Sequence, residues 1–168
     1  MDEAVSAAPF PDPRSSAQEA VQVCTEAHLR KEGRWSGQVD GRDVVVFHHQ
    51  GGSYCMDRIC HHAGGPLQDG DIEDIAGHAC IVCPWHKIKI TLASGESLYR
   101  AIDPATIKQR PPKTRWTSKG VKQRMHTAEI RNGNVYVTLS NNEQKVDSDY
   151  YYSEEYKKLV SSSKRGTT

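Results

Sequence analysis

The sequence predicts an all-β domain of stacked antiparallel β-sheets over residues 19–140. Short runs of alternating apolar residues are separated by turn residues roughly every 8–12 positions. Two dipeptides, Asp40-Gly41 and Asn132-Gly133, stand between such runs and indicate tight hairpins. No segment shows the pattern of a long amphipathic helix. This combination is typical of sandwiches and barrels.

The elements of this domain follow in chain order. Residues 21–30 (VQVCTEAHLR) contain β-branched residues in rough alternation, which predicts a strand. The run VDGRDVVVF after it predicts two strands joined by a turn, and residues 126–140 predict the last hairpin of the domain. Between them, residues 103–110 (DPATIKQR) have room for a single helical turn.

Both ends of the chain differ in composition from the middle. Residues 1–18 are rich in Pro, Ala and Ser, which predicts a disordered tail. Residues 141–168 predict a polar C-terminal tail, with a short helix over 153–160 (SEEYKKLV). Four tyrosines leave open the alternative that this tail packs on the domain: Tyr150, Tyr151, Tyr152 and Tyr156.

Charge and hydropathy restrict the partners of the chain. Its 168 residues include 22 basic and 21 acidic ones, so no strong net field steers it to nucleic acid. Residues 104–128 hold seven basic residues and no acidic one, which we interpret as solvated surface or a protein docking patch. No run approaches the ~20 apolar residues of a membrane span. The N-terminus lacks signal or transit-peptide composition, so we expect a cytoplasmic protein. We also expect a monomer.

Residues 60–86 concentrate three cysteines and four histidines. The first pair of candidate metal ligands, Cys60 and His62, has the spacing C-x-H. In an extended segment, residues two apart point to the same side, so both can face one centre while His61 points away. His61 remains the alternative ligand at this position.

The second pair of candidate ligands, Cys83 and His86, belongs to the sequence CPWH. Pro84 fixes its own φ angle and favours a tight turn, which brings the two side chains together. Each loop thus supplies one thiolate and one imidazole. Cys80 forms an alternative C-x-x-C pair with Cys83, although we predict it to be a buried strand residue. The same prediction holds for Cys24 and Cys55.

Two kinds of metal centre could use a ligand set of two cysteines and two histidines. Zinc commonly takes two Cys and two His, but zinc fingers usually draw Cys with Cys from one knuckle and His with His from a helix. A centre with two unlike irons instead suits one Cys and one His from each loop.

The two motifs together resemble the Rieske iron–sulfur signature. C-x-H is followed by HAGGPL, and CPWH by TLASGESL, much as in the soluble low-potential Rieske-type ferredoxins of animal cells. The resemblance implies one 2Fe-2S cluster at the tip of two loops of a three-sheet antiparallel fold. It further implies that Cys60 and Cys83 bind the inner iron, and His62 and His86 the outer one.

Several positions depart from the high-potential members of that family. Those proteins join their two cluster loops by a disulfide at positions that are Gly65 and Trp85 here. They also donate hydroxyl hydrogen bonds to the cluster from positions that are Ile88 and Ile90 here. Fewer such bonds destabilise the reduced cluster, so we expect a potential of roughly −150 mV. Lys87 stands where many low-potential relatives have glycine.

These observations predict a soluble one-electron carrier between a redox protein donor and a redox protein acceptor, both unidentified. We expect an electron-transfer protein rather than an enzyme, because an oxygenase needs a second iron site and only His126 follows residue 86. Two alternatives stay open: a zinc-stabilised Cys2His2 interaction module, and the ferredoxin component of a multicomponent oxygenase.

Overall fold

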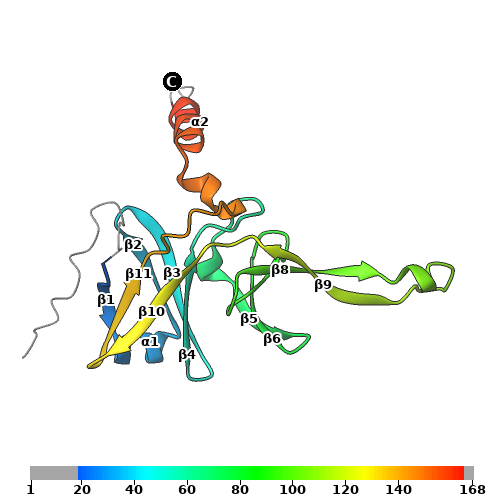
Figure 1. Cartoon of the computed structure of the whole chain (residues 1–168), viewed down its shortest axis with the longest axis horizontal. Coiled ribbons are helices and arrows are strands. Elements are labelled where there is room, and N and C mark those ends of the chain that lie inside the picture. The colour runs from blue at the N-terminus through cyan, green and yellow to red at the C-terminus, as the bar shows by residue number, and fades with distance from the viewer. Residues whose placement is uncertain (1–18, 165–168) are drawn as a thin grey trace, which may run out of the picture.

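Two antiparallel sheets make up most of the protein (Figure 1), which confirms the all-β class. The computed structural model describes residues 19–164, so the tail predicted at residues 1–18 lies outside the described residues. The first sheet has the strand order β1-β11-β10-β4-β3-β2. Its strands are β1 (Val21–Thr25), β2 (Arg34–Val39), β3 (Arg42–His49), β4 (Gly52–Asp57), β10 (Met125–Arg131) and β11 (Asn134–Thr138).

The second sheet has five strands in sequential order, β5 to β9. The short helical elements lie between strands or after them. The strands are β5 (Asp71–Ile75), β6 (His78–Val82), β7 (Lys89–Thr91), β8 (Glu96–Ile102) and β9 (Thr114–Val121). The helical elements are α1 (Glu26–Glu32), η1 (Leu67–Asp69), η2 (Pro104–Thr106), η3 (Asp147–Tyr152) and α2 (Glu154–Lys164).

Strand β10 joins the two halves of the first sheet. Met125 and His126 at its start pair with β4, whereas residues 127–131 pair with β11. Val44 and Val46 of β3 pack in one cluster with Val135 of β11, so the two halves face each other across a core. The three sheets implied by the resemblance are therefore two hydrogen-bonded sheets, with β10 shared by both halves of the first.

Strand β3 lies between the two hydrophobic cores of the domain and contributes side chains to both. Successive side chains of a strand point to opposite faces, and both faces of β3 are buried. Val45 and Phe47 pack into a second core, shared with the five-stranded sheet, that also contains Cys60 and Cys83. Burial of each large apolar side chain stabilises the fold by about 1.5–3 kcal/mol. The candidate thiols thus sit at the end of a packed core.

The hairpins predicted from local turn chemistry are confirmed. Asp40 and Gly41 join β2 to β3 with φ angles of 49° and 81°. Asn132 and Gly133 join β10 to β11 with φ angles of 50° and 78°. Two-residue turns that match the twist of the strands need positive φ at both positions, which Asn-Gly and Asp-Gly tolerate best.

The strand predicted over residues 21–30 is only half right. Strand β1 ends at Thr25, whose hydroxyl accepts a hydrogen bond from the His28 N–H and caps helix α1. Gly33 ends the helix in the left-handed conformation. A polar cap and a terminal glycine are sufficient to start and stop a short helix whose Leu29 is buried in the core.

The other predicted helical segments are present. η2 lies within residues 103–110, and α2 begins one residue later than the helix predicted over 153–160 and extends beyond it to Lys164. No helix within residues 19–164 is long and apolar enough to cross a lipid bilayer.

Candidate metal centre

Loop 1, residues 58–66, carries the first candidate pair between β4 and η1. It closes on itself, because the Cys60 N–H donates to the Gly65 carbonyl at 2.9 Å. The Gly64 N–H returns to the Cys60 carbonyl at 3.0 Å. The Cys60 side chain is buried, whereas His62 is exposed at the turn. The loop therefore presents its thiol inward and its imidazole outward, as the resemblance to the Rieske signature implies.

Loop 2, residues 83–88, carries the second pair between β6 and β7. The Cys83 N–H donates to the Ile88 carbonyl at 2.8 Å and closes the turn. His86 and Lys87 have φ angles of 62° and 55°, in the left-handed region that glycine adopts most easily. Cys83 is buried and His86 is exposed, so loop 2 repeats the arrangement of loop 1.

The four side chains meet as two pairs of like donors. The buried thiols of Cys60 and Cys83 lie side by side in one core cluster. The imidazole rings of His62 and His86 lie 5.2 Å apart between centroids, at an interplanar angle of 79°. Across residues 19–164, no three His, Cys, Asp or Glu side chains already surround one point as ligands of a single ion would. The donor set and its pairing fit a binuclear cluster with an inner thiolate end and an outer imidazole end.

Burial and backbone hydrogen bonds act in opposite directions on the charge of the Cys60 sulfur. Burial raises the pKa of the Cys60 thiol to about 12, and the neighbouring Cys83 adds to the rise. The backbone N–H groups of His62 and Ala63 point at the same sulfur and oppose this rise. Those N–H groups are oriented to stabilise negative charge on sulfur, which metal binding supplies when it displaces the proton.

Gly65 lies where the two loops touch. A Cβ atom at this position would lie 2.5 Å from Cys83 Sγ and 3.1 Å from Trp85 Cβ. Positions 65 and 85 are therefore in contact, as the resemblance to disulfide-bridged relatives implies, but glycine and tryptophan occupy them. Trp85 is 50% exposed, so it covers the site only in part.

The two alternative ligands, His61 and Cys80, have different surroundings from the four paired donors. Burial lowers the pKa of His61 to about 4, so this imidazole is neutral. Its Nε2 is buried and has no hydrogen-bond partner within residues 19–164, whereas the ring of His62 contacts His86. Cys80 is buried in β6, and burial raises the pKa of its thiol to about 11.

Gln123 braces loop 1, a role that the sequence did not reveal. Its side-chain amide donates to the carbonyls of Asp57 and Ile59, each at 2.8 Å. Its side-chain oxygen accepts the His61 N–H at 3.0 Å. One buried side chain therefore fixes the backbone on both sides of Cys60. No local signal identifies Gln123, because its partners lie more than 60 residues away in the chain.

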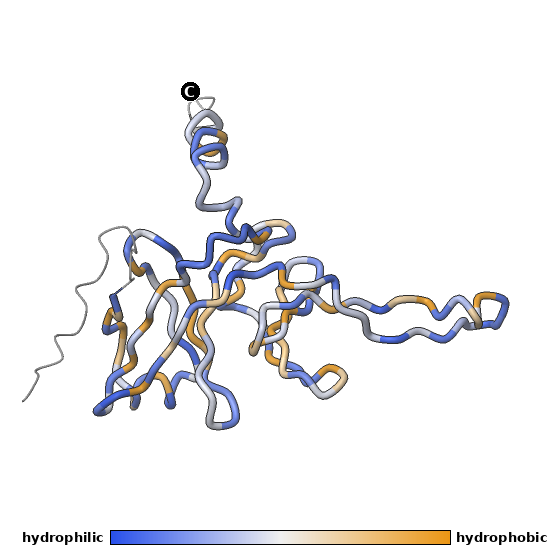
Figure 2. The backbone as a smooth tube through the Cα atoms, in the orientation of Figure 1, coloured by the Kyte–Doolittle hydropathy of each residue, from blue (hydrophilic) through white to orange (hydrophobic). Residues whose placement is uncertain are grey.

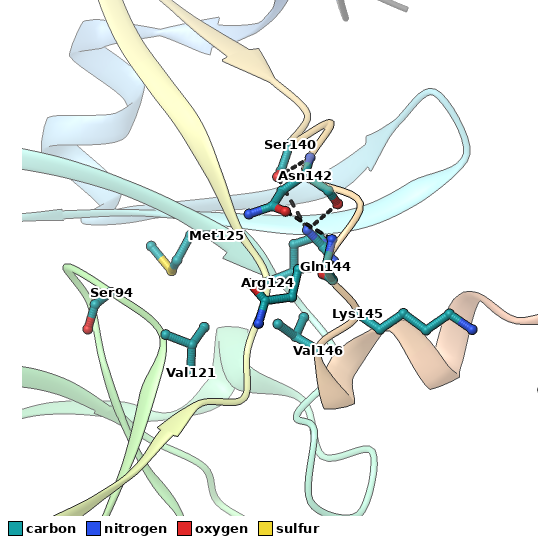
Figure 3. A pocket seen from close by; sticks show the side chains of 9 residues that line it. All are labelled: Ser94, Val121, Arg124, Met125, Ser140, Asn142, Gln144, Lys145 and Val146. Atoms are coloured by element: carbon teal, nitrogen blue, oxygen red, sulfur yellow. Dashed lines mark hydrogen bonds between the residues drawn. The ribbon is translucent and has the colours of Figure 1, made fainter.

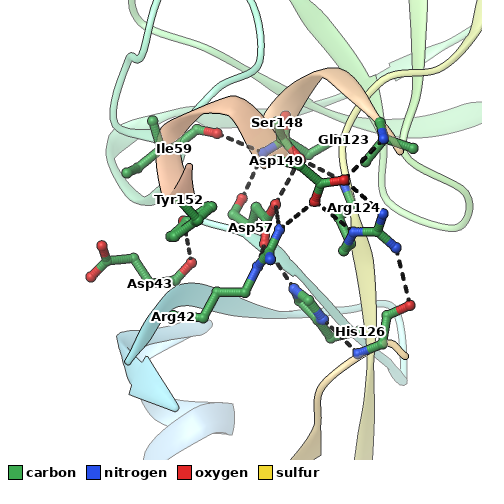
Figure 4. Close-up of polar contacts among 12 residues, drawn as sticks. Arg42, Asp43, Asp57, Ile59, Gln123, Arg124, His126, Ser148, Asp149 and Tyr152 are labelled. Carbon is green, nitrogen blue, oxygen red and sulfur yellow. Dashed lines mark hydrogen bonds and ion pairs between the residues drawn. The ribbon is translucent and has the colours of Figure 1, made fainter. Parts of the chain in front are cut away.

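A polar network around Asp57 supports the same loop (Figure 4). This carboxylate is fully buried and receives two hydrogen bonds from Arg42, both 2.7 Å, and one from the Ser148 hydroxyl at 2.6 Å. The Ser140 N–H donates to Nδ1 of His126, so Nδ1 acts as an acceptor and the imidazole carries its proton on Nε2. This Nε2–H donates to Asp57 at 2.8 Å. Burial alone would raise the pKa of Asp57, but the bonds from Arg42 and His126 outweigh it and lower the pKa.

The C-terminal segment, residues 141–164, is hydrogen-bonded to this network through Asp149. Arg124 donates two hydrogen bonds of 2.7 Å to Asp149, and Arg42 donates a third. These bonds outweigh burial and hold the pKa of Asp149 well below its usual range. The interpretation of residues 104–128 as an exposed basic segment is wrong for Arg124, because its side chain is only 8% exposed.

The tyrosines of the predicted tail reach the domain. The Tyr152 hydroxyl donates to the Asp43 carbonyl at 2.7 Å, and its ring lies under the Arg42 guanidinium. Tyr151 lies against loop 1, with ring atoms 3.1 Å from where a Cβ of Gly64 would be. The alternative of a tail packed on the domain therefore holds for this stretch.

Two hollows border the C-terminal segment. One, of about 360 Å³, lies where that segment crosses the start of β10, beside Arg124 and Met125 (Figure 3), and contains no candidate ligand. The other, of about 690 Å³, lies between loop 1 and η3 and is lined by His62 and Tyr151. The exposed His62 edge therefore faces a groove walled by the C-terminal segment.

The chain was compared with known proteins. The family model described as soluble Rieske-type ferredoxin matches residues 21–142. A Rieske domain-containing protein of Homo sapiens is 50% identical over 152 residues, which are 90% of this chain and 95% of that protein.

Solved structures show the same fold. The ferredoxin of carbazole 1,9a-dioxygenase from Nocardioides aromaticivorans has a TM-score of 0.54 at 20% identity, covering 72% of this chain and 98% of that one. A ferredoxin structure in complex with the oxygenase of carbazole 1,9a-dioxygenase has a TM-score of 0.53 at 19% identity, covering 76% and 99%. The chain belongs to the soluble Rieske-type ferredoxin family, whose cofactor is a Rieske-type 2Fe-2S cluster.

Proposed function

We propose that this member of the soluble Rieske-type ferredoxin family carries single electrons between redox proteins and holds its cluster through Cys60, His62, Cys83 and His86. The observation that supports this most is the like-with-like pairing of the donors across two loops, thiols inside and imidazoles outside. When bound, the cluster supplies a reversible one-electron couple. The exposed imidazole edges give a partner the shortest approach to it.

The protein residues have separate tasks in this function. Cys60 and Cys83 hold the buried end, where the N–H groups of His62 and Ala63 stabilise charge on sulfur. Gln123 fixes the geometry of loop 1. The surrounding apolar core excludes water from the sulfurs.

The low potential that we propose rests on two isoleucines, Ile88 at the end of loop 2 and Ile90 in β7. Ile90 is fully buried in the core and Ile88 packs against it. An isoleucine side chain has no hydroxyl, so neither residue can donate a hydrogen bond to the cluster. Fewer donors leave the reduced, more negative state less stabilised, so we place the potential near the low end of the Rieske range, roughly −150 mV.

The partners proposed here are a protein donor and a protein acceptor, and an oxygenase component is one candidate acceptor. Cys24, Cys55 and Cys80 are free thiols, which supports a reducing compartment such as the cytosol. Only His126 follows His86 in the sequence, and its Nε2 is hydrogen-bonded to Asp57, which speaks against a second iron site with two histidines; we therefore propose a carrier rather than an enzyme.

Matched neighbouring substitutions test the ligand assignment. We expect Cys83→Ser and His62→Ala to abolish the visible absorption and the EPR signal of dithionite-reduced protein. The controls Cys80→Ser and His61→Asn, at similar positions in the same segments, should keep both. A control that loses the signal while its neighbour retains it would contradict the assignment, and a colourless wild type with one bound zinc would favour the interaction module.

A further inference from the structure

A hairpin with a strong positive charge projects from the second sheet. This basic arm, residues 98–121, contains most of β8, all of β9 and the turn between them, and Figure 1 shows it extending away from both cores. It holds six basic residues and one acidic residue, a net charge of +5 in a chain whose net charge is only +1. The six are Arg100, Lys108, Arg110, Lys113, Arg115 and Lys119.

The charge of the arm is not neutralised within the molecule. Across residues 19–164, none of the six basic side chains forms an ion pair with a carboxylate. The next basic residues along the chain are different, since Lys122 pairs with Asp147 and Arg124 with Asp149. The acidic residues of this sheet gather on β5, at the opposite edge from β9.

Two of these cations stack on aromatic rings and share a groove with loop 2. Arg100 stacks over Trp116 at 4.9 Å, and Lys119 over Tyr99 at 5.1 Å. Both pairs line a groove of about 490 Å³ that extends to Lys87 in loop 2, the residue after His86. The root of the basic arm therefore adjoins loop 2 at Lys87, next in sequence to the exposed His86.

The far end of the arm offers apolar contact. Figure 2 shows a mostly hydrophilic arm with a hydrophobic stretch at its tip, where Ile107 is 67% exposed. An exposed apolar side chain within a charged rim is typical of a protein interface.

We infer that the basic arm and loop 2 form the docking surface for an acidic redox protein, which exchanges its electron through His86. This inference rests on the proposed function. Unpaired charge beside an exposed cluster edge accelerates encounter with a partner of opposite charge. Nucleic acid is the poorer match, because one face of Trp116 and of Tyr99 is already covered by a cation of the arm.

The test uses the holoprotein and flavodoxin hydroquinone, an acidic flavoprotein, as electron donor in stopped-flow mixing. The arm variant is Arg100→Gln with Lys119→Gln. The control, Arg30→Gln with Lys31→Gln, removes the same charge from exposed positions of α1. Rates are compared at ionic strengths of about 0.01 M and about 0.15 M, where the Debye lengths are about 30 Å and about 8 Å.

At low salt, the arm variant should reduce the rate roughly tenfold and the control less than twofold, with the difference shrinking at high salt. The charge-preserving variant Arg100→Lys with Lys119→Arg should keep the wild-type rate, which separates lost charge from a misfolded arm. Equal rates in the arm and control variants, with the cluster EPR signal intact, would overturn the docking surface and leave the carrier function standing.

Two further results are informative. Micromolar binding of a fluorescent single-stranded DNA that is lost in the arm variant, with an unchanged flavodoxin rate, would reassign the arm to nucleic acid. A protein without a cluster would overturn the proposed function and this inference with it, and the EPR spectrum recorded before mixing identifies that case.

Discussion

Loop 1 and loop 2 present the same pair of donors but are supported in different ways. Loop 1 is braced by Gln123 and Tyr151, which lie far away in the chain, and by the adjacent Asp57 with its more distant partners. Loop 2 closes through a backbone bond between Cys83 and Ile88, and its exposed turn faces the basic arm. The difference indicates that loop 1 depends on tertiary contacts for its shape, whereas loop 2 depends on local backbone geometry.

The largest effect should come from removing the centre of the loop 1 support. Asp57→Ala leaves His126 without its carboxylate and Arg42 with Asp149 alone, and should lower the free energy of unfolding by about 3–5 kcal/mol. The exposed pair of Glu129 with Arg131 is the control, since Glu129→Ala should cost about 1 kcal/mol or less. Chemical denaturation followed by circular dichroism measures both, and similar losses would contradict the supporting role of Asp57.

Acid should act on the same support through Asp57 and Asp149. Both carboxyls have lowered pKa values in the folded protein, so they contribute stability above the ordinary carboxyl pKa of about 4. That contribution is lost as the pH falls through the folded values. At neutral pH, Asp149→Asn should cost about 1.5–3 kcal/mol, and the deficit should shrink as the pH falls below about 4. A deficit that stays constant down to pH values of about 2 would show that ionisation is not its cause.

Loss of the Gln123 brace should be a smaller effect that is focused on loop 1. Gln123→Leu leaves the Asp57 and Ile59 carbonyls and the His61 N–H unpaired, at a cost of about 1–3 kcal/mol. Iron release to a chelator, followed by visible absorption, should accelerate together with this loss. Gln38→Leu, at an exposed position, should change neither quantity.

Two glycine substitutions that should change stability in opposite directions test the local account of loop 2. Lys87→Gly relieves a left-handed residue and should stabilise the protein by about 0.5–1 kcal/mol. Lys89→Gly, two residues later in β7, should instead destabilise it by a similar amount, because glycine weakens a strand. Thermal unfolding of the two variants gives the signs, and two losses would refute the local account of loop 2.

The same contrast explains what could be predicted from the sequence. The hairpins at Asp40 and Asn132 and the donor spacing of each loop are local, so a few adjacent residues determine them. The signal that starts α1, the capping residue Thr25, is also local, but it lies inside a run whose composition is typical of a strand. Gln123 and Arg124 act through partners distant in the chain, so nothing near them in the sequence distinguishes them from surface residues.

The measurement that tests the account most directly is Mössbauer spectroscopy of protein enriched in the iron-57 isotope, oxidised and then reduced. One thiolate pair and one imidazole pair make the two irons unlike, so we expect two quadrupole doublets of equal area in the oxidised protein. On reduction, the ferrous character should appear on the imidazole-bound iron alone. Two equivalent irons, or a purified protein that contains zinc and no iron, would contradict the assignment of Cys60, His62, Cys83 and His86.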